Sequence, residues 1–369
     1  MSDPLHAAFL AAITAAPDDD LPRLVYADFL DESGDGERAE FIRTQIERAK
    51  LHPTDPRRAA LLDRERALLQ QHRDRWGLAE FRGQSQVFHR GFVEEVNVAA
   101  EWLVAHPDSL PASPLVRHLR AVSASQFTDR LARVPGLARL HTLDLTNTTF
   151  GQPAQVRNFF AVPRLDSLRS LALRNCNFWE GDELAALADT PVARRLRELD
   201  LSGNRLADAG LRELAARPEF AGLERLVCRA NEQEHYFCAH ADGAEALADS
   251  PHLRRLHTLD LGDHYIFGAG LRALANSPNA TGLEWLGVEY NEIGEAGDGG
   301  IRAVVESTRL GNLRELWYGG NRLGPLGAEA LAAWPHLERM TRVDLSECPL
   351  TPDVQAILRG SRWAAKFAF

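Results

Sequence analysis

The sequence has 369 residues, of which 45% are hydrophobic and 25% charged, the balance of a globular protein with enough apolar material for a core. Its formal net charge of −10 argues against a dedicated nucleic-acid binder, because that function needs a basic surface. A single compact domain of this length is unusual, so we expect either two domains or an elongated array.

Cysteine usage, the N-terminal residues and the apolar runs bear on where the protein is located. The four cysteines have no regular spacing, which is typical of proteins from a reducing compartment. The first Lys or Arg is Arg23, so the positively charged start of a secretory signal is absent. No apolar run approaches the roughly 18 residues that a membrane span needs. We therefore expect a cytoplasmic protein with no membrane contact.

Four helices are predicted before residue 85. Pro4 to Ala16 has apolar residues at helical spacing, and aspartates 18–20 suit the start of a second helix because they meet the positive end of its dipole. The stretch 33–36 breaks the second helix, and residues 53–56 separate the third from the fourth. Residues 1–85 are thus predicted to form a small all-α domain.

One loop in this region has the residue types of a calcium site. Asp31, Ser33, Asp35 and Gly36 match the opening of an EF-hand loop. The twelfth position is Ile42, where that loop requires a bidentate Glu. We favour a helix-turn-helix corner over a calcium site.

Tyr26, Asp28 and Arg38 admit two interpretations. A carboxylate and a guanidinium orient a phenol in some catalytic sites, so the three residues form one candidate catalytic set. The alternative is an ion pair and a tyrosine that fasten two helices together. We favour the second interpretation.

The segment from Leu21 to Gln45 resembles the bacterial repeat-companion domain, a module found at the start of proteins that continue into repeats. The residues that match its pattern are Arg23, Tyr26, Ala27, Asp28, Leu30, Glu32, Gly34, Arg38, Ala39, Glu40, Phe41 and Ile42. That family has no assigned activity. The resemblance therefore implies a bacterial protein in which repeats follow, and it says little about function.

Repeats make up the rest of the chain. Leu196, Leu199, Leu201, Asn204 and Leu206 fit the pattern L-x-x-L-x-L-x-x-N-x-L, which alternates like a strand and then changes to helical spacing. The residues at the leading position of successive units are Val93, Leu119, Leu140, Leu168, Leu196, Leu223, Leu256, Leu283, Leu313 and Met340. The step that follows Leu119 is too short for a full helix.

These units resemble the ribonuclease-inhibitor type of leucine-rich repeat, in which helices line the convex side of a horseshoe and a parallel sheet lines the concave side. We therefore predict an α/β leucine-rich-repeat solenoid over residues 86–369. Residues 351–369 begin with a helix start at Pro352 and end in aromatic residues. Because the open end of a solenoid core must be covered, this segment is predicted to be the cap.

The position occupied by Asn204 defines a column along the repeats. Its members are Glu101, Phe127, Thr148, Cys176, Asn204, Asn231, His264, Asn291, Asn321 and Cys348. Asn or Cys at this position fills the interior of a turn, where it bonds to buried backbone. We interpret Cys176 and Cys348 as structural residues and not as nucleophiles.

Two insertions, Glu232 to Asp242 and Glu292 to Gly299, leave the repeats at the strand-to-helix turn and are expected to project from one rim. The longer insertion contains His235, Tyr236, Phe237, Cys238 and His240. With Cys228 nearby these are zinc-ligand types, but the spacing C-x6-H-x2-C-x-H is uncommon for zinc. We favour an aromatic loop that packs or contacts a partner, and we expect no metal and no cofactor.

Strand alternation places every second side chain of a repeat on the concave face. Most units place Asp, Ser, Thr or small residues there, for example Asp144, Asp200, Asp260 and Asp344. The residues predicted to contact a partner are Trp285, Glu289, Tyr290, Glu315, Trp317, Arg225 and Arg229 on this face, with His235, Tyr236, Phe237 and His240 on the rim. Aromatic residues that face solvent mark contact sites. The alternative is that the two tryptophans cover neighbouring glycines.

Signatures of the common enzyme classes are absent: the sequence contains no G-x-S-x-G, phosphate loop or H-E-x-x-H motif. We expect a non-enzymatic scaffold that binds a protein partner along the concave face and one rim. One alternative is a regulatory subunit, an inhibitor or activator whose helical domain contacts its target enzyme. Catalysis in the helical domain is the least favoured hypothesis. The sequence predicts neither the partner's identity nor the oligomeric state.

Overall fold

The computed structural model describes residues 4–52, 55–162, 165–231 and 237–369. The chain divides into two compact units, residues 1–122 with 133–143 and residues 123–132 with 144–369. The division falls within β4 (Thr142–Asp144). The helical domain of residues 1–85 remains a prediction, since the first unit contains the helices together with the first strands.

The first unit begins with the four predicted helices. They are α1 (Pro4–Ala15), α2 (Leu21–Glu32), α3 (Gly36–Lys50) and α4 (Arg57–Trp76), followed by β1 (Ser85–His89), β2 (Phe92–Ala99), α5 (Ala100–Ala105), α6 (Ser109–Ala112) and β3 (His118–Val122). β2 pairs antiparallel with β1 and parallel with β3. The repeat pattern did not predict β1, because β1 belongs to no repeat.

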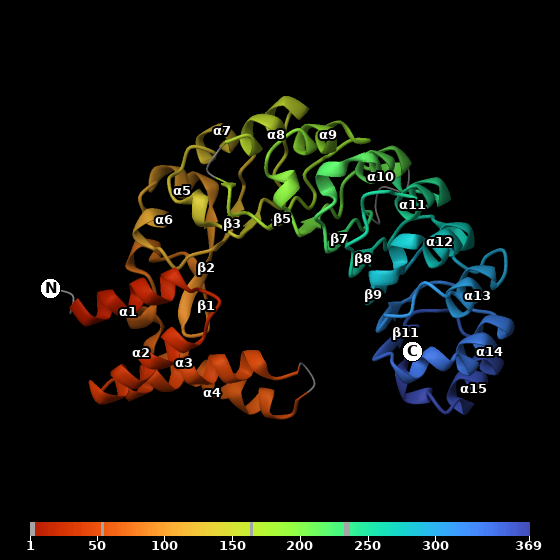
Figure 1. The fold of residues 1–369 in the computed structure, drawn as a ribbon, viewed down its shortest axis with the longest axis horizontal. Helices are drawn as coiled ribbons and strands as arrows, with labels where there is room; N and C mark the ends of the chain where they lie inside the picture. The colour runs from red at the N-terminus through yellow and green to blue at the C-terminus, as the bar shows by residue number, and fades with distance from the viewer. Residues whose placement is uncertain (1–3, 53–54, 163–164, 232–236) are drawn as a thin grey trace. The chain divides into compact units, whose positions relative to one another are not determined.

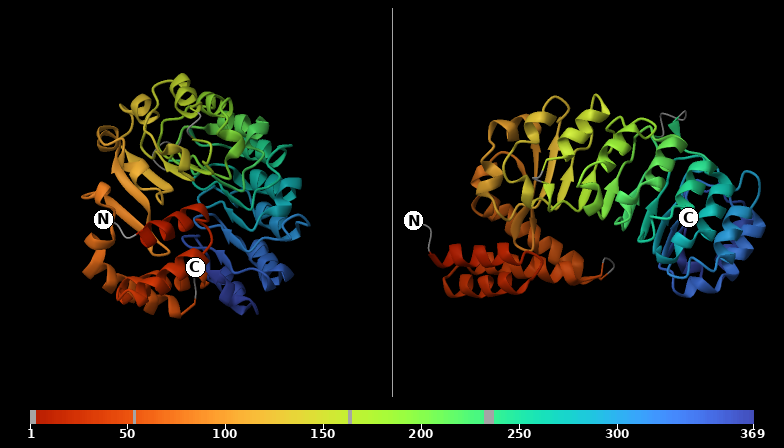
Figure 2. Two further views of the ribbon diagram at one scale, coloured as in Figure 1. Left: turned by 60° about the vertical axis from the view of Figure 1, so that its left-hand side comes forward. Right: turned by 45° about the horizontal axis from the view of Figure 1, so that its top comes forward.

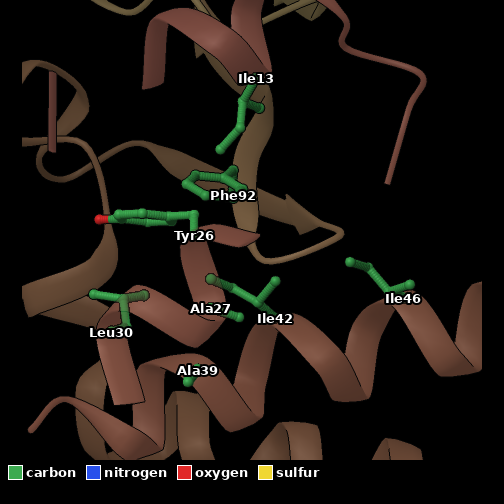
Figure 3. Close-up of a cluster of buried hydrophobic side chains, with 8 residues drawn as sticks. All are labelled: Ile13, Tyr26, Ala27, Leu30, Ala39, Ile42, Ile46 and Phe92. Atoms are coloured by element: carbon green, nitrogen blue, oxygen red, sulfur yellow. The ribbon is translucent and has the colours of Figure 1, made fainter. Parts of the chain in front are cut away.

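The core of the first unit joins α1, α2, α3 and β2. It contains Ile13, Tyr26, Ala27, Leu30, Ala39, Ile42, Ile46 and Phe92 (Figure 3). On the outer side, Arg43 pairs with Asp28 and with Asp31, each at 2.6 Å. The predicted ion pair between Asp28 and Arg38 is therefore wrong: Arg43 fastens α2 to α3, and Asp28 is largely exposed.

The second unit repeats a strand, a turn and a helix. Its strands after β4 are β5 (Ser170–Ala172), β6 (Glu198–Asp200), β7 (Arg225–Val227), β8 (Thr258–Asp260), β9 (Trp285–Gly287), β10 (Glu315–Trp317), β11 (Arg342–Asp344) and β12 (Phe367–Ala368). Its helices are α7 (Thr128–Leu131), α8 (Pro153–Phe160), α9 (Asp182–Ala188), α10 (Ala207–Ala216), α11 (Ala241–Ala248), α12 (Phe267–Asn276), α13 (Gly299–Glu306), α14 (Pro325–Ala333) and α15 (Pro352–Gly360).

Within this unit the strands from β5 to β12 lie side by side in chain order, and each neighbouring pair is parallel. The strands form the inner side of an arc and the helices form the outer side (Figures 1 and 2). The middle residue of each strand is buried in the core, as Leu199, Leu286 and Leu316 show. α7 has four residues, as the short step after Leu119 predicted.

The asparagine column holds the turns together. The Asn204 amide accepts from the backbone N–H groups of Cys176 and Phe178 and donates to the carbonyls of Leu173 and Leu201, all at 2.7–3.0 Å. Asn291 and Asn321 bond to backbone in the same way. Because each amide satisfies buried backbone groups in its own and the preceding repeat, this column aligns successive units.

Other residue types take the same position. His264 donates from Nε2 to the Cys228 carbonyl at 2.6 Å and accepts at Nδ1 from the Ala239 N–H at 3.0 Å. Cys176 and Cys348 each donate from Sγ to a backbone carbonyl. The structural interpretation of both cysteines agrees with this geometry.

The C-terminal segment covers the last repeat. Thr351 caps α15, accepting at Oγ1 from the Val354 N–H at 3.5 Å, and β12 then pairs with β11. Phe367 of β12 is buried. β12 was not predicted, since two residues are too few to show a strand period.

Candidate functional site

The tryptophans predicted on the strand face lie on neighbouring strands. Trp285 begins β9 and Trp317 ends β10, while Leu286 and Leu316 between them are fully buried. Both indoles are half-buried. Since alternate residues of a strand point to opposite faces, the indoles lie on the face away from the leucine core. Their ring centroids are 6.0 Å apart, with 36° between the ring planes.

Gly287 explains how the two rings meet. A Cβ atom at this position would lie 2.5 Å from the Trp285 ring, so the indole lies directly over Gly287. Gly287 is also the register partner of Trp317. Trp285 therefore does cover a glycine, and the absence of a side chain there lets the indole lie across the sheet towards Trp317.

The aromatic row continues onto β11. The Arg342 guanidinium lies 4.6 Å from the Trp317 ring centroid, a cation–π contact, and also pairs with Asp344. The Trp317 Nε1–H donates to Glu315 Oε2 at 3.0 Å. Arg342 was not among the predicted contact residues, although it holds the same position in its repeat as Trp285 does.

Tyr290 lies beyond the end of β9 and is 43% exposed. Its backbone is left-handed, with φ at 52°, and its ring lies over Gly320, where a Cβ atom would be 2.3 Å from the ring. The hydroxyl donates to Glu347 Oε2 at 2.5 Å. Tyr290 is therefore an aromatic residue whose orientation is fixed and whose side chain is partly exposed.

Arg229 and Glu289 brace β7 to β9. Arg229 lies 2.9 Å from Glu289, 2.8 Å from Asp263 and 3.3 Å from Asp260. Burial acts to lower the pKa of Arg229, but the three carboxylates outweigh it and raise that pKa. Burial raises the pKa of Glu289. Arg225, the other predicted arginine, is exposed.

The aspartates predicted on the strand face have a structural role. Asp144, Asp200, Asp260 and Asp344 each accept, at 2.8–3.0 Å, from the backbone N–H two residues further along. Each carboxylate therefore closes the turn that follows its strand. These aspartates therefore stabilise the fold, and the aromatic residues on the same face do not share that role.

The rim loop is described in part. His235 and Tyr236 lie outside the described residues. Phe237 packs edge-on against Trp179 at 4.8 Å, and Arg205 lies over both rings at 5.1 and 5.5 Å. Phe237 thus packs against the two preceding repeats.

On its other side the rim continues with His240. Its ring lies 6.0 Å from Tyr265 and 6.3 Å from Phe267. Sequence reasoning missed Trp179, Tyr265 and Phe267, because Trp179 lies in a different repeat from Tyr265 and Phe267 and only the fold brings them to one rim.

Burial makes the thiols poor nucleophiles. Burial raises the pKa of Cys176 to about 12, that of Cys348 to about 11, and that of Cys228 well above its usual value. Cys238 donates to the Asp263 carbonyl. In the described part of the chain, no group of three or more His, Cys, Asp or Glu residues is arranged to hold a metal ion.

Comparison with known proteins identifies the repeat. A leucine-rich-repeat family model matches residues 194–215, which contain β6 and most of α10. No curated protein sequence matches the chain. Solved structures that match include an internalin from Listeria monocytogenes, 18% identical, covering 72% of this chain and 70% of that one, with a TM-score of 0.45. Because the flanking units repeat the geometry of 194–215, the second unit is a leucine-rich-repeat solenoid.

No helix among the described residues is long and apolar enough to cross a membrane.

Proposed function

We propose that this chain is a non-enzymatic recognition protein that binds a protein partner on the strand face at β9 and β10, centred on Trp285, Trp317 and Tyr290. The observation that carries the proposal is the pair of half-buried indoles on adjacent strands, facing away from the leucine core. Covering Gly287 and Gly320 accounts for the positions of Trp285 and Tyr290 but not for an indole at Trp317.

The residue types are those that dominate binding energy at interfaces. Trp, Tyr and Arg are enriched among the interface residues whose truncation costs most. Trp285, Trp317, Tyr290 and Arg342 supply all three types on three consecutive repeats. The polar atoms of Trp317, Tyr290 and Arg342 already bond to Glu315, Glu347 and Asp344 respectively, so these three side chains are held in place before a partner arrives. Preorganised side chains lose little entropy on binding.

Charge indicates the chemistry of the partner. Glu315 bonds to Trp317, Glu347 to Tyr290 and Asp344 to Arg342, so this group of bonded side chains contains three carboxylates and one cation. The face of an indole attracts cations, and nearby carboxylates add to this attraction. We therefore infer a partner segment with an Arg or Lys beside an apolar side chain. Its association rate is expected to fall as salt is raised.

The proposal includes the rim, where Phe237, His240 and Phe267 lie. Phe267 is 40% exposed, and His240 is exposed beside it. The predicted contacts of His235 and Tyr236 remain proposals. Arg225 extends the strand face, whereas Arg229 and Glu289 contribute by bracing β7 to β9.

A quantitative pulldown from a lysate of the source cells tests the strand face. The double variant Trp285→Ala/Trp317→Ala is expected to recover the partner at least tenfold less than the wild type. Leu326→Ala, which removes a 63% exposed apolar residue from α14 on the helical side, is the matched control and is expected to leave recovery unchanged. Circular dichroism confirms that each variant folds.

Equal recovery by the double variant and the wild type overturns the strand-face proposal. A parallel Phe267→Ala variant measures the share of the rim. If the captured partner is an enzyme, its activity with and without saturating chain decides between a passive scaffold and a regulatory subunit.

A further inference from the structure

The first unit contains a cleft of about 370 Å³ that the proposed function does not use. It is lined by residues from α1, α2, α3, the end of α4, β2 and the segment after α6. Its walls are mainly apolar, with Leu30, Phe92 and Leu115 among them. In Figure 3 the Tyr26 hydroxyl, which belongs to a lining residue, points away from the labelled core residues.

Arg38 lines this cleft as a buried cation. It is 8% exposed, and its guanidinium lies 4.9 Å from the Trp76 ring and 5.4 Å from the Phe92 ring. Burial lowers its pKa to about 10, which still leaves it charged at neutral pH. Within the described residues Arg38 forms no salt bridge, and its Nη1 has no hydrogen-bond acceptor. Asp35, the carboxylate beside it in the cleft, pairs with Arg75 at 2.7 Å.

Two more donors on the same cleft lack a partner. The Trp76 Nε1–H and the Ser113 hydroxyl are buried and have no hydrogen-bond partner in the part of the chain that the structure describes. A guanidinium and an indole N–H can only donate. Most buried polar groups in folded proteins are paired. Unpaired ones also occur elsewhere among the described residues, but here three donors belong to residues that line one cleft, where an acceptor from a ligand could reach them. The His6 ring and the Tyr26 hydroxyl are excluded because they bond to each other at 2.7 Å.

Charge and size select the acceptor. Two carboxylates, Asp35 and Glu80, line the cleft, and Asp35 pairs with Arg75. A single negative charge can pair with Arg38, whereas a phosphate dianion would be repelled by both carboxylates. The apolar walls fit a hydrocarbon body, and the volume lies at the small end of known ligand sites.

We propose that this cleft binds an organic monocarboxylate with a compact apolar body, whose oxygens accept from Arg38, Trp76 and Ser113. The donor atoms are shielded from water, so the ligand reaches them by displacing side chains at the mouth of the cleft, where Leu10 and Arg75 are exposed. The carboxylate belongs either to a small molecule or to the C-terminus of a peptide.

Isothermal titration of the full-length protein with phenylacetate tests the proposal, and phenylacetamide serves as the uncharged probe of the same shape. Phenylacetate is expected to bind at least tenfold more tightly than phenylacetamide. A peptide that ends in Phe, with a free or an amidated C-terminus, separates the two sources. Tighter binding of the free-acid peptide than of phenylacetate assigns the cleft to a chain terminus, and the reverse assigns it to a small molecule.

Variants locate the binding. Arg38→Met is expected to weaken phenylacetate binding at least tenfold, and Trp76→Phe, which keeps a ring but removes the N–H, about threefold or more. Arg66→Met removes one positive charge from an exposed part of α4 outside the cleft and is expected to change nothing. A thermal melt of each variant confirms folding.

Three outcomes overturn the proposal: no heat from phenylacetate at 10 mM, equal affinity for phenylacetate in Arg38→Met and the wild type, or equal affinity for phenylacetate and phenylacetamide. Inorganic phosphate that binds more tightly than phenylacetate likewise overturns the choice of a monocarboxylate.

Discussion

Buried polar groups are arranged differently in the asparagine turns of the repeats and in the cleft of the first unit. In the repeats, Asn204 uses both ends of its amide to satisfy backbone groups. In the cleft of the first unit, Arg38, Trp76 and Ser113 hold buried donors with no acceptor among the described residues. An unpaired buried donor costs about 1–3 kcal/mol. Polar burial in the turns therefore builds the fold, whereas polar burial in the cleft weakens it and makes sense as preparation for a ligand.

The same contrast exists within the first unit. Arg23 and Arg38 are both buried arginines. Arg23 lies 2.5 Å from the buried Glu94 and also donates to the Pro17 carbonyl. Arg38 has aromatic rings around it and, among the described residues, no salt bridge to a carboxylate. Burial alone therefore does not distinguish a structural arginine from a ligand-binding one. The distinguishing feature is whether a carboxylate of the same chain already pairs with the guanidinium.

The largest effect is expected where an interior amide is removed. Asn204→Ala leaves two N–H groups and two carbonyls without their partner, so we expect it to lower the free energy of unfolding by about 4 kcal/mol. Urea unfolding followed by circular dichroism measures this. Asn312→Ala is the control, since the exposed Asn312 makes a single hydrogen bond to the Thr281 carbonyl, and it is expected to cost less than about 1 kcal/mol. Equal costs for the two variants would contradict the role of the column.

The next largest effect is expected when Arg23 and Arg38 are each replaced by Met. Arg23→Met is expected to cost about 3 kcal/mol, because it leaves the buried Glu94 with only Arg90, at 3.5 Å, as a partner. Arg38→Met is expected to change stability by less than about 1 kcal/mol, since it removes a cation and leaves no buried carboxylate behind. Both values come from urea unfolding in one buffer without added carboxylates. A large loss for Arg38→Met would show that Arg38 has an internal partner in solution.

His264 is expected to make the stability of the fold depend on pH. Burial lowers the pKa of His264 to about 4, below its ordinary value of about 6.5. Because the folded state resists protonation, the stability that this residue provides is complete above pH 6.5 and is lost as the pH falls below it. Asn204, Asn291 and Asn321 hold the same position in their own repeats, and an Asn side chain does not titrate.

We therefore expect that, between pH 7.5 and pH 5, the wild type loses about 2 kcal/mol more stability than His264→Asn does. Urea unfolding at both pH values measures the difference, and all other titrating groups cancel between the two proteins. Parallel pH profiles would mean that His264 is protonated in the fold.

The repeats could be predicted because their pattern is local and recurs. Each leading residue, from Val93 to Met340, lies in or just before a strand between β2 and β11. The same alternation predicted that Trp285 and Trp317 share a face, since it depends only on the strand period. β1 and β12 were missed because neither belongs to a repeat.

The cleft could be predicted only in part. Arg38 and Tyr26 were singled out together in the sequence, and both line it. Trp76 and Ser113 lie far from them along the chain, and only tertiary packing brings these residues to one cleft. Whether a buried donor has a partner depends on the residues packed around it and not on the donor itself. A sequence pattern therefore cannot predict it.

The smallest effect separates two buried serines. The Ser250 hydroxyl donates to the Ala215 carbonyl at 2.6 Å and accepts from the His252 N–H at 3.2 Å, whereas the Ser113 hydroxyl has no partner among the described residues. Ser250→Ala is expected to cost about 1.5 kcal/mol, and Ser113→Ala is expected to cost nothing or to stabilise slightly, because removing an unpaired hydroxyl removes a desolvation penalty. Urea unfolding of both variants in the same buffer resolves differences of this size.

Ser113 and Ser250 are alike in chemistry and in burial. The sign of the Ser113→Ala effect therefore shows whether the Ser113 hydroxyl has a hydrogen-bond partner in solution. If Ser113→Ala costs as much as Ser250→Ala, the Ser113 hydroxyl has an acceptor in solution and the cleft loses one of its three free donors. If Ser113→Ala is neutral without ligand but reduces the stabilisation that phenylacetate provides, the hydroxyl acts only when the cleft is filled. That combination distinguishes a residue kept for binding from a residue kept for folding.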